Sequence, residues 1–239
     1  MNPETMKQTT IEGHSCLLHA SPNPALLLIQ VTARHERSTI DAEVAQIAAC
    51  SPVGVVFAAV ELTDWVGQLM PWADDAVMRR ATKPPCAADT LAYITGSLLP
   101  WLRSHYGPLP CVLGGYSLGG LFALWASYQS ADFCGVAAAS PSVWIKGWTA
   151  YTHQHTLHAC HVYLSLGDRE EHARNQRMAA VGPCIRDLYQ WLSRQMDQGG
   201  VVLEWNPGGH FGHEADRTAR AFAWVCARQA ACGDELGRK

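Results

Sequence analysis

Residues 113–120 read LGGYSLGG and join a short apolar run to an apolar stretch with helical spacing. This arrangement predicts a strand, a sharp turn and a helix, with Ser117 at the turn. Gly115 and Gly119 complete the pattern G-x-S-x-G, in which glycines leave room where strand and helix nearly touch. The turn would expose the serine oxygen, and the Leu118 amide and the helix dipole would face negative charge developing on a bound carbonyl oxygen. Ser117 is therefore predicted to be a nucleophile for acyl transfer.

Two other interpretations of this stretch explain less of it. A glycine-rich turn with a serine N-cap would need no chemistry, but it does not account for the strand, the doubled glycines and the helix together. A phosphate-binding loop needs the spacing G-x-G-x-x-G or the ending G-K-[ST], and residues 113–120 have neither. The serine N-cap remains the structural alternative.

The composition limits the class of protein. The chain has 239 residues, of which 48% are hydrophobic and 16% charged, and its formal net charge is -3. The length fits a single α/β domain over residues 1–239. The charge balance leaves no basic face for nucleic acid, and no apolar run approaches the ~18 residues of a membrane helix. Without a signal-peptide pattern, we expect a cytoplasmic protein with no nucleic-acid or membrane partner, of undetermined oligomeric state.

Cysteines and histidines do not form metal-binding patterns. The nine cysteines include no C-x-x-C pair, and most lie in apolar segments, where they act as small hydrophobic residues in a reducing compartment. His153, His155, His158 and His161 have a mixed spacing that fits no single face of a helix or strand, and no carboxylate or cysteine set completes a site. We expect no disulfide, no metal and no cofactor.

Apolar runs and helical patterns alternate along the chain. A first strand or hairpin arm is predicted at 9–19, and further strands at 25–31, 53–60, 133–139, 161–166 and 201–205. Helical spacing covers 39–49, 87–105 with an interruption at Pro100, 178–196 with a kink at Gly182-Pro183, and 215–231, before a polar tail at 233–239. Irregular, aromatic excursions at 61–86 and 144–158 are expected near the site. This order predicts the α/β-hydrolase fold, a mostly parallel central sheet with helices on both faces.

A serine nucleophile needs a base, which in this fold follows the last strand. Residues 208–213 read GGHFGH at that point. His210 follows two glycines and is the predicted base. His213, which is expected to begin the final helix, is the alternative.

The acid that orients the base should follow the strand that ends near residue 166. Three carboxylates lie within one turn of that strand: Asp168, Glu170 and Glu171. Spacing alone does not separate them.

Other residues are predicted to contact the substrate. A second oxyanion amide should come from the loop after residues 25–31, around Thr32 or Ala33. Tyr116, beside the serine, and Trp72 and Trp144, in the irregular segments, are predicted to bind substrate. The tryptophans of those segments, Trp65, Trp72, Trp144 and Trp148, are alternatively core residues.

Four stretches give the chain a resemblance to a known family. They are DW at 64–65 with PW at 71–72, the elbow at 114–120, ASPSVW at 139–144 and GGH at 208–210. From about residue 25 to the final helix, the chain resembles the esterases related to esterase D and the ferric enterobactin esterases, within the α/β-hydrolase superfamily. The resemblance implies hydrolysis of a small-molecule carboxylic ester without metal or organic cofactor.

The resemblance also implies roles for particular residues. In such esterases the acid often stands three residues after the glycine that ends its strand, and Gly167 places Glu170 there. Ser117 would be the nucleophile, His210 the base and Glu170 the acid. Relatives cleave thioester, feruloyl, siderophore and other esters, so the substrate stays undefined. The alternatives are an acyltransferase or thioesterase with the same triad, or an inactive hydrolase-like binding module.

Overall fold

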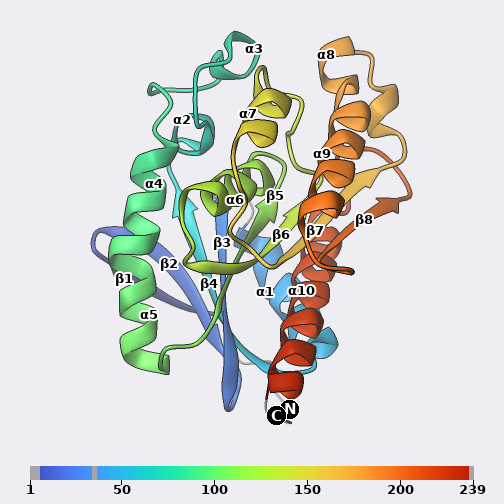
Figure 1. The fold of residues 1–239 in the computed structure, drawn as a ribbon. Coiled ribbons are helices and arrows are strands. Elements are labelled where there is room, and N and C mark those ends of the chain that lie inside the picture. Colours follow the sequence, from blue (N-terminus) through green and yellow to red (C-terminus); the bar gives the residue numbers. More distant parts are fainter. Residues whose placement is uncertain (1–5, 34–36, 237–239) are drawn as a thin grey trace.

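One eight-stranded sheet organises the protein. A computed structural model describes residues 6–33 and 37–236. The strands are β1 (Lys7–Ile11), β2 (His14–Ala20), β3 (Pro24–Ala33), β4 (Gly54–Leu62), β5 (Cys111–Tyr116), β6 (Phe133–Ala139), β7 (His161–Gly167) and β8 (Val201–Asn206). They lie in the order β1-β2-β4-β3-β5-β6-β7-β8 (Figure 1). The β1–β2 hairpin joins β4 antiparallel, and every later pair is parallel. The predicted fold class is thereby confirmed.

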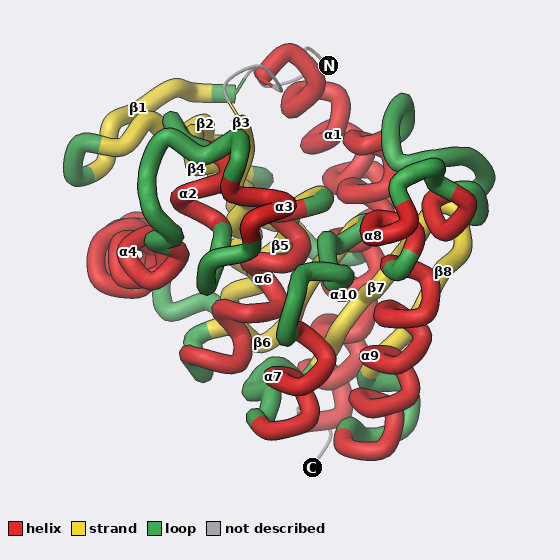
Figure 2. The backbone as a smooth tube through the Cα atoms, turned by 90° about the horizontal axis from the view of Figure 1, so that it is seen from above, coloured by secondary structure: helices red, strands yellow, loops and turns green. Residues whose placement is uncertain are grey.

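Helices cover both faces of this sheet. They are α1 (Arg37–Cys50), α2 (Trp65–Leu69), α3 (Asp75–Met78), α4 (Ala87–Tyr93), the π-helical turn η2 (Ile94–Leu98), α5 (Leu99–Tyr106), α6 (Leu118–Gln129), α7 (Trp148–Gln154), the 3₁₀ turn η3 (Glu170–His172), α8 (Gln176–Ala179), α9 (Val181–Gln195) and α10 (Glu214–Leu236). Figure 2 shows α1 on one side of the sheet and α4, α6, α7 and α9 on the other.

Two apolar cores follow from the two-residue period of the strands. In β3, Leu27 and Ile29 face the core under α4, α5, α6 and α9, whereas Leu26 and Leu28 face the core under α1 and α10. Buried apolar residues on both faces are what a parallel sheet covered by two helical layers requires. The strands that carry the site are therefore fixed from both sides.

The helix predicted at 87–105, with an interruption at Pro100, is interrupted by the π-helical turn at 94–98, just before Pro100, which has no amide to donate to the preceding turn. Three other sequence expectations need correction. The excursions at 61–86 and 144–158 contain short helices, α2 and α3 in the first and α7 in the second. The break predicted at Gly182-Pro183 lies at Ala180, and Pro183 sits in the first turn of α9, where its missing N–H breaks no bond. In the predicted polar tail, residues 233–236 continue α10, and 237–239 lie outside the described residues.

The excursion at 61–86 is held by one buried carboxylate. Asp64 caps α2 through the Gly67 amide, and its other oxygen accepts hydrogen bonds from the Thr82 amide and hydroxyl and from the Lys83 amide, at 2.8–3.0 Å. Burial raises the pKa of Asp64, but these hydrogen bonds outweigh it and hold the pKa below its ordinary value. One ionised side chain thus ties both ends of the excursion together.

We expect Asp64→Asn to lower the free energy of unfolding at neutral pH by about 2 kcal/mol, because an amide NH₂ would face a backbone donor. A carboxylate with a lowered pKa stabilises the fold above its unfolded pKa, and this contribution is lost as pH falls through its folded pKa. The destabilisation should therefore shrink in acid. Urea unfolding at pH 7 and below pH 4 measures both effects. Asp75→Asn, an exposed change in the same excursion, is the control.

Candidate active site

Ser117 occupies a strained turn between β5 and α6. Its φ and ψ are 56° and -116°, a conformation that residues with a side chain rarely adopt. The Ser117 amide donates to the Ala139 carbonyl at 3.0 Å, which fixes the turn against β6. A Cβ on Gly115 would lie 2.8 Å from the backbone carbon of Gly119, so the close approach of strand and helix requires glycine there. The sequence therefore builds an elbow with the serine at its tip.

The three candidate side chains lie in a chain of hydrogen bonds. His210 Nε2 lies 3.0 Å from Ser117 Oγ, and His210 Nδ1 lies 2.6 Å from Glu170 Oε2. Because a carboxylate only accepts hydrogen bonds, Nδ1 carries the proton and donates a hydrogen bond to Glu170. Nε2 is then free to accept from the serine hydroxyl. This arrangement can remove the proton of Ser117 while its oxygen attacks a carbonyl carbon.

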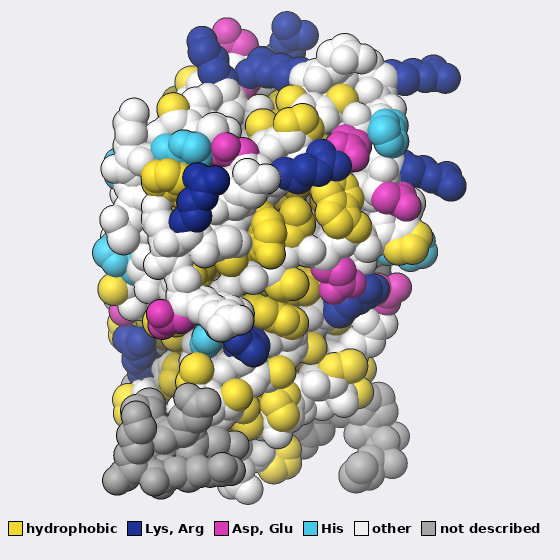
Figure 3. Space-filling model, turned by 45° about the vertical axis from the view of Figure 1, so that its right-hand side comes forward, with side chains coloured by type: hydrophobic (Ala, Val, Ile, Leu, Met, Phe, Trp, Pro, Cys, Tyr) yellow, Lys and Arg dark blue, Asp and Glu magenta, His cyan; other side chains and the backbone are white. Residues whose placement is uncertain are grey.

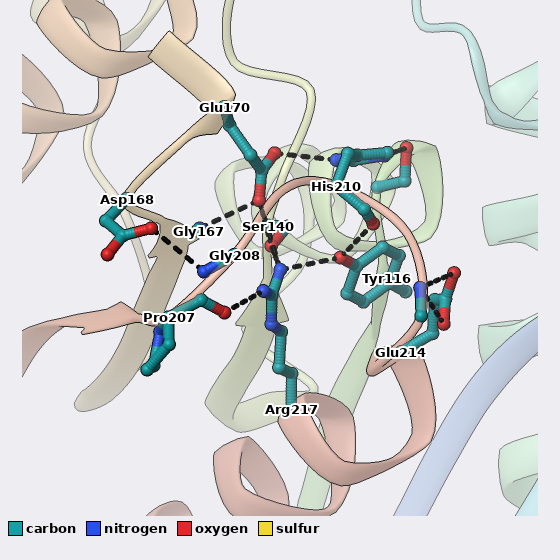
Figure 4. A network of polar contacts seen from close by, with 12 residues as sticks. Tyr116, Ser140, Gly167, Asp168, Glu170, Pro207, Gly208, His210, Glu214 and Arg217 are labelled. Atoms are coloured by element: carbon teal, nitrogen blue, oxygen red, sulfur yellow. Dashed lines mark hydrogen bonds and ion pairs between the residues drawn. The ribbon is translucent and has the colours of Figure 1, made fainter. Parts of the chain in front are cut away.

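The carboxylate of Glu170 is buried and held in one orientation. Its Oε1 accepts from the Gly167 amide at 2.8 Å and from Ser140 Oγ at 2.9 Å (Figure 4). Burial raises the pKa of Glu170, but the hydrogen bond and charge of His210, with these two donors, outweigh it and lower the pKa below its ordinary value. Glu170 is therefore ionised at neutral pH, with Oε2 turned to the imidazole.

The other two carboxylates considered have different partners. Asp168 accepts from the Gly208 amide at 2.9 Å and so fixes the turn before His210. Glu171 forms a two-bond ion pair with Arg186 of α9, at 2.7 Å for each bond. Of the three acidic residues, Glu170 is the one that bonds to the histidine.

His213, the alternative base, lies at the start of α10. Its carbonyl accepts from the Arg217 amide, and its ring, 62% exposed, lies 3.9 Å from Asp216. These contacts give it a helix-capping position rather than a place beside Ser117.

The two predicted oxyanion amides stand in different settings. Leu118 is the first residue of α6, so its amide has no partner within the helix. Thr32 was expected in a loop, but it lies within β3 and pairs with Glu61 of β4. Strand β3 is longer than its apolar run because Thr32 and Ala33 extend its ladder with β4. Residues 34–36, which follow this strand in the sequence, lie outside the described residues.

Ser142 is a residue of this site that the sequence did not single out as functional. Its Oγ lies 3.3 Å from Ser117 Oγ, and its amide donates to the Ser117 carbonyl at 3.1 Å. The motif S-P-S at 140–142 was the available signal, since Ser140 bonds to Glu170 and Ser142 to Ser117. The strand exit after β6 thus supports both ends of the hydrogen-bonded chain.

A cavity of about 1140 Å³ opens over Ser117 and His210. Its wall combines aromatic residues with arginines: Trp65, Trp144, Phe211, Arg80, Arg169 and Arg177. Phe211 is 79% exposed and stands edge-on to the His210 ring. Figure 3 shows lysine and arginine side chains gathered at the upper end of the molecule, above hydrophobic ones. The volume is sufficient for a bulky ester.

The predicted substrate contacts divide between the cavity and its surroundings. Trp144 and Tyr116 line the cavity. Tyr116 also donates its hydroxyl to the His210 carbonyl at 2.6 Å. Trp72 is not among the lining residues in the described structure. Its indole donates to the Lys146 carbonyl at 2.8 Å and packs against Trp148 and Tyr151.

The described residues contain no group of three or more metal-ligating side chains placed to hold an ion. His153 bonds to Asp187 at 2.9 Å, and His155 bonds to the Tyr151 carbonyl at 2.7 Å. All nine cysteines are free thiols. Within residues 6–33 and 37–236, no helix has the length and apolar character to span a membrane.

The fold is that of the α/β hydrolases, with Ser117 at the turn between β5 and α6. The family model described as "Putative esterase" matches residues 43–193, which is more than half of the chain. The chain belongs to this family and is a carboxylic ester hydrolase, as the sequence predicted. No curated protein matches the sequence significantly.

Solved structures share the fold at low sequence identity. Siderophore hydrolase EstA from Aspergillus nidulans superposes with a TM-score of 0.70 at 19% identity, over 93% of this chain and 94% of that one. An IroE-like serine hydrolase from Shewanella oneidensis superposes with a TM-score of 0.74 at 12% identity, over 93% of this chain and 80% of that one. The enterobactin esterase FES from Shigella flexneri superposes with a TM-score of 0.65 at 16% identity, over 96% of this chain and 61% of that one.

Proposed function

We propose that this protein is a serine esterase that works through an acyl-enzyme intermediate. Ser117 Oγ attacks the ester carbonyl while its proton passes to His210 Nε2, and Glu170 stabilises the imidazolium that forms. The Leu118 amide stabilises the tetrahedral oxyanion. The alcohol leaves with the proton from His210. Water then attacks the acyl-enzyme with His210 again as base, which releases the acid and restores Ser117.

The observation that carries this proposal is the unbroken hydrogen-bonded chain from Glu170 through His210 to Ser117, with heavy-atom distances of 2.6 and 3.0 Å. Nucleophile, base and orienting acid within such distances are the signature of an activated serine. The elbow adds the Leu118 amide at a helix N-terminus, where negative charge is stabilised.

Covalent labelling tests this proposal. A fluorophosphonate should add to the protein with a stoichiometry of one, and peptide mass spectrometry should place the adduct on Ser117. Hydrolysis of short and medium p-nitrophenyl esters should show turnover by the same protein. Absence of both labelling and turnover would contradict the proposal and favour a binding module.

The proposed substrate class is a bulky ester. The cavity of about 1140 Å³ supports it, and the structural neighbours include a siderophore hydrolase and an enterobactin esterase. We therefore propose a siderophore-type ester as the first natural substrate to assay. Product analysis with an added alcohol would detect acyl transfer beside hydrolysis.

The role proposed for Glu170 predicts a large loss in Glu170→Gln. Oε1 accepts from Gly167, Ser140 and also from Arg217 of α10, whose Nη1 lies 3.2 Å away. These donors favour the amide oxygen at that position, so the NH₂ would face His210 Nδ1 and impose the wrong tautomer. We expect kcat to fall about 10²- to 10⁴-fold. Glu171→Gln, which removes an exposed ion pair one residue away, should keep kcat within about twofold. Steady-state kinetics of the two variants decide which carboxylate acts.

A further inference from the structure

Arg217 is a buried cation that the proposed mechanism does not use. It lies in the first turns of α10, and its side chain is 2% exposed. Taking a guanidinium out of water is unfavourable unless charged and hydrogen-bonding partners replace the solvent. The groups around Arg217 should therefore compensate for the burial of its charge.

Its guanidinium reaches four acceptors on four segments of the chain. Nη1 lies 3.1 Å from Tyr116 Oη, 3.3 Å from Ser140 Oγ and 3.2 Å from Glu170 Oε1, and Nη2 donates to the Pro207 carbonyl at 3.0 Å. Figure 4 shows these partners converging on the guanidinium. They come from the end of β5, the exit of β6, the turn η3 and the exit of β8. These are the segments that carry Ser117, Ser142, Glu170 and His210.

The directions of the hydrogen bonds in this network are mutually compatible, with the two protons of Arg217 Nη1 shared among three acceptors. The Tyr116 hydroxyl donates to the His210 carbonyl, so it accepts from Arg217. Burial raises the pKa of Tyr116 to about 12, which keeps that hydroxyl protonated. The Ser140 hydroxyl donates to Glu170 Oε1 and likewise accepts from Arg217. Arg217 therefore supports Glu170 directly and through Ser140, and supports the His210 loop through Tyr116 and Pro207.

The network also explains how a glutamate is held at this position. A glutamate has more rotatable bonds than an aspartate and needs more anchoring to keep one orientation. Gly167, Ser140 and Arg217 all donate to Oε1, which leaves Oε2 for His210. Arg217 is absent from the residues lining the cavity in the described structure, so it meets no substrate there.

We propose that Arg217 is a positioning residue of the esterase site, whose guanidinium locks Glu170, the serine elbow and the His210 loop into one arrangement. This inference rests on the proposed serine-esterase function. It gives α10, which packs on the face of the sheet opposite to α6, a role in aligning His210.

The test compares Arg217→Met and Arg217→Lys with the wild-type protein in p-nitrophenyl ester hydrolysis. Arg217→Met should lower kcat about 10- to 100-fold because the base and its acid lose alignment. KM should change less than about twofold, since Arg217 lies outside the cavity. Arg217→Lys keeps the positive charge but lacks the planar guanidinium, so its kcat should lie between those of Arg217→Met and the wild-type protein. Arg220→Met is the control, because Arg220 lies one turn further along α10 and pairs with Glu204 at the surface.

The pH profile separates a positioning role from a merely structural one. The titratable groups that face or bond Glu170 in the described structure are His210, Arg217 and Tyr116. Removing the positive charge of Arg217 favours proton uptake by Glu170, to which it bonds. The acid limb of kcat should therefore move to higher pH in Arg217→Met and stay in place in Arg217→Lys. Identical profiles and kcat values in all three proteins would overturn the inference.

Two controls keep the result decisive. If Arg217→Met does not fold, as judged by circular dichroism, Tyr116→Phe removes one hydroxyl of the network at nearly constant volume. It should lower kcat about threefold to tenfold, and an unchanged kcat in both Tyr116→Phe and Arg217→Lys would overturn the inference. Ser117→Ala runs in the same assay. Activity that survives in Ser117→Ala refutes the serine mechanism itself, whereas activity lost there but unchanged in the Arg217 variants refutes only the role of Arg217.

Discussion

Replacing Ser117 with alanine is expected to lower kcat for p-nitrophenyl esters about 10⁴- to 10⁶-fold. The reason is that Oγ is the atom that forms the acyl-enzyme bond, and neither His210 nor the Leu118 amide can replace it. Binding should persist, because the cavity wall is unchanged apart from one oxygen. Initial rates at saturating ester, with active-site titration of the wild type, measure the effect. A Ser117→Ala protein with wild-type kcat would contradict the nucleophile assignment.

The strained turn supplies a control for this result. Alanine at 117 must adopt the same φ of 56° as serine, so the midpoint of thermal unfolding should hardly change. Glycine adopts that conformation without a steric penalty. Ser117→Gly should therefore raise the midpoint while losing activity equally. This pair of variants separates loss of the nucleophile from loss of the fold.

The elements that form the sheet were predictable from the sequence because their signals are local. Strands β3 and β4 are mostly apolar along their length, and β6 was predicted at 133–139 with the bounds that the structure has. The elbow follows from glycines at positions where a Cβ would collide with backbone. A strand buried on both faces needs apolar residues, and a close approach of two backbones needs glycine, so both features can be recognised in the sequence.

Contacts between distant segments were harder to predict. Glu170 and Glu171 are neighbours of the same type, and what separates them is Arg186 on α9, which pairs with Glu171. Arg217 has no local signal, since an arginine in an amphipathic helix is usually exposed. Its burial depends on acceptors from four segments that meet only in the folded protein.

The predictions that aromatic residues line the substrate cavity were limited in the same way, because they too depend on contacts between distant segments. Trp72 and Trp144 both lie in irregular segments rich in tryptophan, which predicted pocket walls for both. The structure brings Trp144 to the cavity and stacks Trp72 on Trp148 of α7. Side-chain direction in a short excursion depends on the helix packed beneath it, and the sequence pattern did not reveal α7.

Replacing His210 with alanine should be nearly as damaging as loss of the serine, because members of such a unit do not act independently. Without the imidazole, no group at 3.0 Å accepts the Ser117 proton or returns it to the leaving alcohol. We expect kcat to fall about 10⁴-fold or more. The double variant Ser117→Ala, His210→Ala should be little worse than either single one, and kcat values for the three proteins measure this coupling.

The matched control is His213→Ala, three residues away on the same loop. His213 contributes its carbonyl to the start of α10, and alanine keeps that carbonyl, so kcat should stay within about threefold. Its ring is 62% exposed and pairs weakly with Asp216. If His213→Ala instead abolished turnover while His210→Ala spared it, the base would have to reach Ser117 from the helix start. The 2.6 Å bond between His210 and Glu170 would then be a structural contact, and the role of Glu170 would fall with that of His210.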